Sequence, residues 1–158
     1  MEMEEKAIQT FYPDDFSHCY GCGKLNASGF RIRTRFDGDE TVTHFTPESH
    51  HIALPGFVYG GLVASLIDCH AMATASGAAL RAAGHAVGDV PSPRFVTAQL
   101  NVSYLRPTPL GPELEIRARV KETTARKTIV EITVSAGGTV TARGEVVAVP
   151  MPESMKRS

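Results

Sequence analysis

Asp68 is the residue whose type and position point most directly to chemistry. It is the only acidic or basic side chain in residues 49–80, a stretch dominated by small and apolar residues. Burial in such surroundings disfavours the charged form of a carboxyl group, so we expect the pKa of Asp68 to be raised. A carboxylate of this kind is a candidate general base. The alternative is a structural aspartate that is hydrogen-bonded to backbone amides.

Gly60 and Gly61 open the helical part of the same stretch. The first N–H groups of a helix have no acceptor inside the helix, and they favour negative charge. Because glycine has no side chain, a substrate carbonyl can reach these N–H groups, which gives an oxyanion-binding site. Asp68 follows two turns later, and we expect it to reach the same region. A Gly-Gly pair alone is also typical of an ordinary turn.

Residues 60–80 are predicted to form one long helix that ends near Gly84. This helix is apolar on nearly all sides, so other parts of the chain must cover most of its surface. Residues 62–80 are also the only candidate for a membrane span. Polar residues such as Asp68 and His70, and the lack of flanking aromatic or basic belts, favour instead a buried helix of a soluble domain.

Alternating apolar and polar residues predict strands on both sides of this helix in the sequence. The expected strands are 30–36, 41–45, 94–105, 113–122, 127–135 and 139–149, with Gly137-Gly138 as a tight turn between the last two. Hairpin links make the later strands antiparallel. An apolar helix and a one-faced sheet can bury each other only if the sheet curls around the helix. The predicted fold class is therefore α+β, with about six strands around one central helix.

The composition limits the possible functions. With 158 residues the chain suits one domain, and 16 basic against 17 acidic residues give a formal net charge of -1. This balance argues against a nucleic-acid groove and against an anionic membrane surface as the partner. The acidic start and the odd number of cysteines favour a reducing cytoplasm and no signal peptide.

His18, Cys19 and Cys22 have a spacing like that of metal ligands. A zinc site needs a fourth ligand, however, and the sequence holds no second cysteine pair. The third cysteine, Cys69, falls within the apolar helix, where we expect it to fill the core. We therefore predict no metal and no cofactor, and we interpret residues 19–23 as a glycine-rich turn that contains cysteines.

Two segments resemble the motifs of hotdog-fold acyl-CoA thioesterases of the PaaI/THEM type. Residues 55–68 are similar to the family pattern PG-x-x-HGG followed by six residues and an aspartate. Residues 96–107 are similar to the third strand of the family, including its N-x-x-Y-x-x-P end. The resemblance implies a lead-in at 1–29, a hotdog domain at 30–149 and a tail at 150–158.

The resemblance also implies roles for individual residues. Asp68 matches the catalytic carboxylate, which acts as general base or nucleophile, and Thr97 matches the hydroxyl that orients water. Gly60 matches the oxyanion N–H donor, supported by Gly61. In this family the carboxylate and the hydroxyl come from different subunits. The alternation agrees, because it places Thr97 on the strand face that points away from its own helix, unless a bulge reverses the strand.

Two positions depart from the pattern. Tyr59 stands where the family has histidine, and Ala53 stands where many members have asparagine or glutamine. His51 lies nearby in the sequence and could position water or substrate, although capping of the loop is the more frequent role. Gly61, Tyr59 and His51 are therefore candidates for substrate binding. Arg106 is a candidate for the phosphates of coenzyme A, with a solvated strand end as the alternative.

The expected activity is hydrolysis of an acyl-CoA thioester to a free acid and CoA. Two alternatives stay open: a hotdog module that binds acyl-CoA without cleaving it, and an enoyl-CoA hydratase or dehydratase that pairs Asp68 with His51. A six-stranded subunit leaves exposed edge strands, so we expect a homodimer that pairs further into a dimer of dimers. The expected partners are acyl-CoA and further copies of the chain, with no nucleic acid and no membrane.

Overall fold

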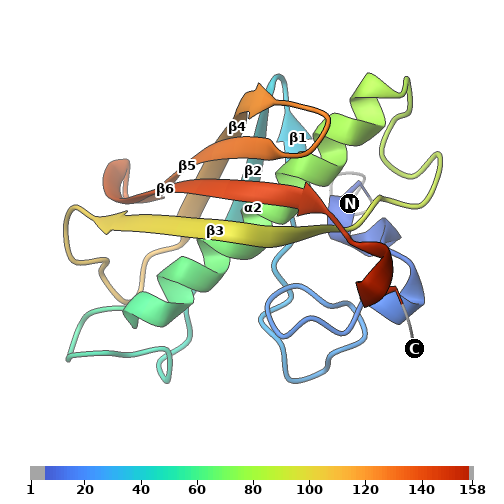
Figure 1. The fold of residues 1–158 in the computed structure, drawn as a ribbon. Coiled ribbons are helices and arrows are strands. Elements are labelled where there is room, and N and C mark those ends of the chain that lie inside the picture. Colours follow the sequence, from blue (N-terminus) through green and yellow to red (C-terminus); the bar gives the residue numbers. More distant parts are fainter. Residues whose placement is uncertain (1–5, 157–158) are drawn as a thin grey trace.

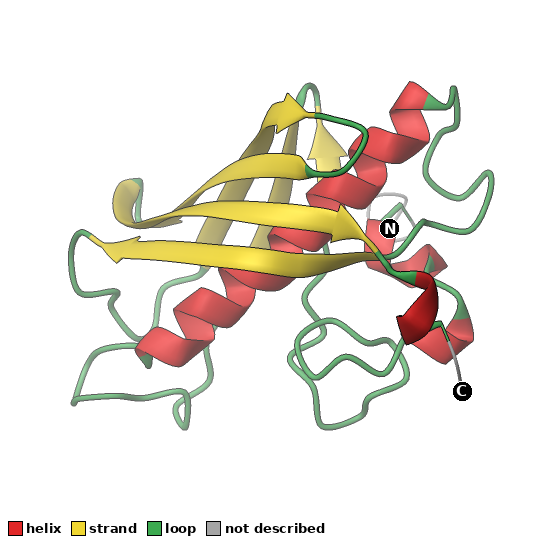
Figure 2. Ribbon diagram, in the orientation of Figure 1, coloured by secondary structure: helices red, strands yellow, loops and turns green. Residues whose placement is uncertain are grey.

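One helix and one curved sheet form the centre of the protein, which a computed structural model describes for residues 6–156 (Figure 1). Every strand pair is antiparallel, and the strand order is β1-β2-β4-β5-β6-β3. The sheet wraps around the helix, as Figure 2 shows. These features confirm the predicted α+β architecture. The elements are β1 (Arg35–Asp37), β2 (Glu40–Phe45), α2 (Gly60–Ala82), β3 (Phe95–Tyr104), β4 (Leu114–Thr123), β5 (Thr128–Ala136) and β6 (Thr139–Pro150).

Helix α2 is buried along most of its length. It is long and apolar enough to cross a membrane by length and composition alone, but 72% of its most apolar window is buried inside the protein. Leu66 and Ile67 pack with residues of β4, β5 and β6 in the main core. The helix ends just before Gly84, whose φ of 81° is a left-handed conformation that glycine adopts without strain. The sheet therefore supplies the cover that the apolar sequence of α2 requires.

The N-terminal segment covers a side of α2 that the sheet leaves open. It contains two short 3-10 helices, η1 (Ile8–Phe11) and η2 (Asp14–Phe16), and a third, η3 (Glu153–Met155), follows β6. Ile8 is fully buried and packs with Ala73 and Leu80 of α2. Residues 1–5 of the expected lead-in, and residues 157 and 158 of the expected tail, lie outside the described part of the chain.

The first strand is shorter than its alternation predicts. Ile32 and Thr34 are buried as expected, but only residues 35–37 pair with β2. Arg31 has a φ of 58°, and the N–H groups of Phe30 and Ile32 donate to the carbonyls of Tyr20 and Gly21 instead. The prediction of a strand from residue 30 is wrong, because this segment is hydrogen-bonded to the N-terminal loop.

The other strands begin and end within one residue of the predicted positions. β4, β5 and β6 form consecutive hairpins, and Gly137 and Gly138 have φ values of 56° and 80°, as a tight hairpin turn requires. β3 pairs with β6 rather than with the following strand β4, so it lies at one edge of the sheet. This placement sets β3 beside α2 at the candidate site.

Candidate functional site

Asp68 and Thr97 form a hydrogen-bonded pair at the edge of the sheet. The Thr97 hydroxyl donates to Asp68 Oδ1 over 2.5 Å. The Asp68 side chain is half-buried in α2, whereas Thr97 on β3 is exposed. The carboxylate is therefore accessible at the surface and is not sealed inside the subunit. A carboxylate held by a hydroxyl at a solvent-accessible edge has the groups needed to bind and activate a water molecule.

A bulge in β3 places Thr97 in this position. Thr97 pairs with Ala148 and Gln99 pairs with Val147, so Ala98 between them has no partner in β6. One extra residue reverses the alternation of a strand. Phe95 and Thr97 face α2 before the bulge, whereas Val102 and Tyr104 face it after the bulge.

The expected orientation of Thr97 is therefore wrong, although the residue does contact an Asp68 side chain. Simple alternation places Val96 toward α2 and Thr97 away from it, toward a partner subunit. The bulge instead turns Thr97 onto the Asp68 of its own chain. The carboxylate and the hydroxyl thus come from one chain and need no second subunit to meet.

The surroundings of Asp68 raise the pKa of its carboxyl group above that of a free aspartate. Burial raises the pKa of Asp68, and the nearby Cys19 raises it further, while the Thr97 hydrogen bond and Arg94 lower it. The largest effect is burial, so the pKa lies above its ordinary value. This direction agrees with the expectation from the apolar sequence and suits a general base.

The start of α2 presents backbone N–H groups that no acceptor occupies. Among residues 6–156, neither the Gly60 N–H nor the Gly61 N–H donates a hydrogen bond. The Tyr104 hydroxyl donates to the Gly60 carbonyl over 2.6 Å and so ties the end of β3 to the first turn of the helix. These free donors are available to an acceptor at the helix start, and their role as an oxyanion-binding group stays a prediction. The sequence reasoning missed the anchoring role of Tyr104, although alternation placed this residue on the inward face.

Gly60 and Asp68 of one chain lie too far apart to act on the same carbonyl group. They are eight residues apart in α2, which corresponds to about 12 Å along the helix axis. A reacting carbonyl must lie within about 3–3.5 Å of both the oxyanion donor and the activated water. One chain alone therefore leaves the two groups two helical turns apart, and the expectation that both reach the same region stays a prediction.

Three of the predicted binding residues, His51, Tyr59 and Gly61, line one cavity of about 660 Å³ beside the start of α2. A Cβ atom on Gly61 would lie 2.4 Å from the Tyr59 ring, so only glycine allows this ring to pack there. The His51 Nδ1 accepts a hydrogen bond from the Glu48 N–H over 2.9 Å. His51 thus caps its loop, and it lines a cavity that Asp68 does not reach.

Arg106 lies on a different side of the helix start. It lines a smaller groove of about 450 Å³ together with Gly60, Phe57 and Tyr104. Arg106 forms no ion pair within residues 6–156. Its guanidinium is therefore available to an anionic group beside the free helix start.

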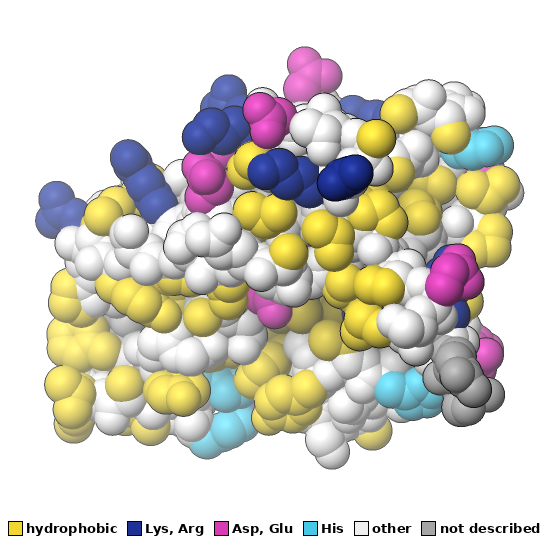
Figure 3. Space-filling model, viewed as in Figure 1, with side chains coloured by type: hydrophobic (Ala, Val, Ile, Leu, Met, Phe, Trp, Pro, Cys, Tyr) yellow, Lys and Arg dark blue, Asp and Glu magenta, His cyan; other side chains and the backbone are white. Residues whose placement is uncertain are grey.

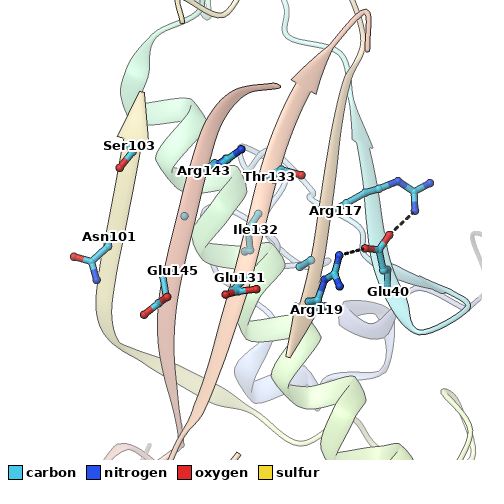
Figure 4. Close-up of a pocket in the computed structure, with 12 residues that line it drawn as sticks. Glu40, Asn101, Ser103, Arg117, Arg119, Glu131, Ile132, Thr133, Arg143 and Glu145 are labelled. Carbon is cyan, nitrogen blue, oxygen red and sulfur yellow. Dashed lines mark hydrogen bonds and ion pairs between the residues drawn. The ribbon is translucent and has the colours of Figure 1, made fainter. Parts of the chain in front are cut away.

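A further groove of about 510 Å³ crosses the outer face of the sheet (Figure 4). Arg117 and Arg119 pair there with Glu40, at 3.4 Å in each case. Figure 4 shows that Asn101, Ser103 and Glu145 project from the strands with α2 behind them. This groove lies on the opposite face of the sheet from Asp68, and exposed ion pairs of this kind contribute little to stability.

Hydrophobic side chains gather over the start of α2 and the loops beside it, at the lower left of Figure 3. Several large apolar residues of this region are exposed in the single chain: Ile52, Leu54, Phe57, Tyr59, Tyr104 and Leu105. Clusters of exposed apolar residues commonly mark an interaction surface. The candidate site therefore lies next to a surface that is suited to contact with another molecule.

Comparison with known proteins identifies the family. The sequence profile of the thioesterase superfamily matches residues 55–143, which is more than half of the chain. The chain belongs to the thioesterase superfamily. A solved thioesterase superfamily protein from Shewanella loihica is 48% identical, over 88% of this chain and 98% of that chain, with a TM-score of 0.68. No curated protein matches the sequence.

More distant structures share the fold of this thioesterase superfamily member. The Escherichia coli PaaI protein from the phenylacetic acid degradation operon is 15% identical over 78% of this chain and 81% of that chain, with a TM-score of 0.63. A Streptococcus mutans protein bound to acetyl-CoA is 18% identical over 76% and 88% of the two chains, with a TM-score of 0.59. The predicted hotdog fold is confirmed.

Proposed function

We propose that the protein hydrolyses acyl-CoA thioesters, with Asp68 as the general base. The observation that carries this proposal is the accessible Asp68–Thr97 pair in a member of the thioesterase superfamily. The similar Streptococcus mutans protein was crystallised with acetyl-CoA, which supports a CoA ester as the substrate. Arg106 forms no ion pair with any described residue and lies near the helix start, so it is suited to a phosphate of the CoA moiety.

The proposed reaction uses one carboxylate and one backbone donor. Asp68 removes a proton from a water molecule that Thr97 orients, and the water oxygen adds to the thioester carbonyl. The Gly60 N–H stabilises the resulting oxyanion. The tetrahedral intermediate then expels CoA as a thiolate, which takes up the proton held by Asp68. A thioester can be hydrolysed by one carboxylate and one backbone donor, because its carbonyl has weak resonance stabilisation and the thiolate leaves readily.

The 12 Å separation within α2 implies that Gly60 and Asp68 act in a dimer. β3 is an edge strand, with β6 on one side only. Thr97, near the start of β3, holds Asp68, and Tyr104, at its end, holds Gly60. If two β3 edges pair antiparallel about a point midway between Thr97 and Tyr104, the Gly60 end of one copy lies beside the Asp68 of the other. Two complete sites then form in each dimer.

The surface of the single chain also favours this dimer. The exposed apolar residues around the start of α2 and the end of β3 lie next to the unpaired strand edge. Pairing of two β3 edges would satisfy free backbone groups and cover these apolar side chains together. We further propose that two such dimers pair into a tetramer.

A panel of aliphatic and aromatic acyl-CoA esters tests the activity, with released CoA measured by a thiol reagent. We expect hydrolysis by the wild type and a loss of about 100-fold or more in kcat for Asp68→Asn. Asp39→Asn, in an exposed turn, is the matched control and should keep wild-type rates. Retained hydrolysis in Asp68→Asn would refute the assigned base. Binding of the esters without hydrolysis by the wild type would refute enzyme function.

Mixed dimers test the division of the site between subunits. Gly60→Pro removes the donor N–H, and proline is well tolerated at the first position of a helix. Tyr59, the residue before it, has φ −57° and ψ 127°, which suits a residue that precedes proline.

Gly60→Pro and Asp68→Asn should each be inactive alone. When they are coexpressed in equal amounts, half of the dimers are mixed and each mixed dimer contains one intact site, so we expect about one quarter of the wild-type activity. No recovery in a confirmed mixed dimer would show that Gly60 and Asp68 do not act across the interface.

A further inference from the structure

Three cysteine sulfur atoms, two from the N-terminal loop and one from α2, lie close together where the loop packs against the helix. The Sγ atoms of Cys19, Cys22 and Cys69 all lie within 4.8 Å of one another, and those of Cys19 and Cys69 are 3.8 Å apart. In tetrahedral zinc coordination, Zn–S bonds of about 2.3 Å place two sulfur atoms about 3.8 Å apart. Cys69 is thus the third member of this group and does not simply fill the core of the helix.

The N-terminal loop has a conformation that brings the three sulfur atoms together. A Cβ atom on Gly21 would lie 2.3 Å from the Cys69 sulfur, and one on Gly23 would lie 2.5 Å from the backbone of Cys19. The Gly23 N–H donates to the Cys19 carbonyl over 2.7 Å. Both glycines are therefore needed for the loop to bring its two thiols against α2.

The groups around the three sulfur atoms suit an anionic centre. The half-buried Arg94 donates to the Phe16 carbonyl of the N-terminal segment, and its guanidinium lies 4.6 Å from the centre of the Tyr12 ring. Three thiolates and one divalent cation carry a single negative charge, which Arg94 would balance.

Tyr12 provides an observation that is independent of the sulfur geometry. Its hydroxyl oxygen is buried and has no hydrogen-bond partner among the described residues. The Tyr12 side chain belongs to the same core cluster as Cys22 and Cys69, and Cys19 packs against that cluster. A buried hydroxyl without a partner is unfavourable, and a water molecule held at the centre would provide the partner.

We propose that Cys19, Cys22 and Cys69 bind one zinc ion, with a water molecule as the fourth ligand and the Tyr12 hydroxyl bonded to that water. Among residues 6–156, no further histidine, cysteine, aspartate or glutamate joins the group, which leaves the fourth position to solvent. Any thiol that is protonated before binding releases its proton to solvent. The ion would tie the N-terminal loop to α2 at the residue next to Asp68.

The test uses the full-length protein, which is reduced, freed of metal with a chelator and titrated with Co²⁺ and Zn²⁺. We expect one equivalent of Co²⁺ to give thiolate-to-metal charge-transfer bands in the near ultraviolet and the strong visible bands of tetrahedral cobalt. One equivalent of Zn²⁺ should remove both sets of bands. A wild-type protein that binds no stoichiometric metal, or binds cobalt without thiolate bands, overturns the proposal without reference to any variant.

Variants locate the ion and separate it from catalysis. Cys22→Ser and Cys69→Ser should lose the cobalt bands, whereas the control His18→Ala, next to the loop, should keep them. Tyr12→Phe should bind zinc about tenfold more weakly. Zinc should raise the unfolding temperature of the wild type and of His18→Ala but not of Cys22→Ser. Bands that persist in Cys22→Ser and Cys69→Ser, or vanish in His18→Ala, overturn the assigned ligands. These readouts do not depend on acyl-CoA hydrolysis.

Discussion

Removal of the Thr97 hydroxyl gives the sharpest test of the Asp68–Thr97 pair. Thr97→Val keeps the shape of the side chain and deletes the donor that is 2.5 Å from Asp68 Oδ1. That hydrogen bond stabilises the carboxylate over the protonated acid and lowers the pKa of Asp68, so its loss must raise this pKa. Because Thr97 is exposed, we take the lower end, about 1.5 kcal/mol, of the range for hydrogen bonds to charged groups.

This free energy corresponds to about one pH unit. We therefore expect the acidic limb of the pH profile of kcat/KM to move upward by about one unit in Thr97→Val. The base is active when it is deprotonated, so the variant loses most activity at acidic pH and least at alkaline pH. The profile is measured from the rate of CoA release at several pH values, with the best substrate of the acyl-CoA panel.

Two further variants complete this experiment. Thr97→Ser keeps the hydroxyl and should leave the acidic limb at its wild-type position. Ser103→Ala deletes a hydroxyl from the outer face of the same strand and should change neither the limb nor the rate. If Thr97→Val lowers kcat/KM equally at all pH values, the hydroxyl does not act through the charge of Asp68, and our reasoning about this pair is wrong.

Three other predictions follow from the described contacts. Deletion of Ala98 should remove the bulge and leave Thr97 opposite Ala148, still facing α2, so a variant that circular dichroism shows to be folded should keep the acidic limb of kcat/KM at its wild-type position. Tyr104→Phe should lower the free energy of unfolding in urea by about 0.5–1.5 kcal/mol, because the bond to the Gly60 carbonyl is lost; an unchanged value would exclude the anchoring role. Burial lowers the pKa of His70 to about 3, so the unfolded chain binds a proton below about pH 6.5 that the folded protein does not. Stability should be highest above pH 6.5 and about 2 kcal/mol lower at pH 5, and His70→Asn should remove this dependence.

The sequence alone determined the features that depend on local periodicity. The uninterrupted apolar run from Gly60 predicts a buried helix whose end differs from the observed one by two residues, and the alternation after Arg94, a repeat of two residues, predicts the later strands to within one residue. Asp68 can also be singled out from the sequence alone. It is the only charged side chain in residues 60–80, and burial of a charge without a partner is unfavourable. The motif around Gly60 and Asp68 then predicted the thioesterase superfamily from residue types and spacing.

Tertiary structure decided what depends on pairing between distant segments. Ala98 forms a bulge only because β3 pairs with β6, and this pairing turns Thr97 toward its own Asp68. Cys69 meets Cys19 only because the N-terminal loop packs against α2. A strand bulge and a loop contact leave no periodic signal in the sequence, since their free energy comes from contacts between residues far apart in the chain. Such details fix which face a side chain occupies, and so which groups can act together.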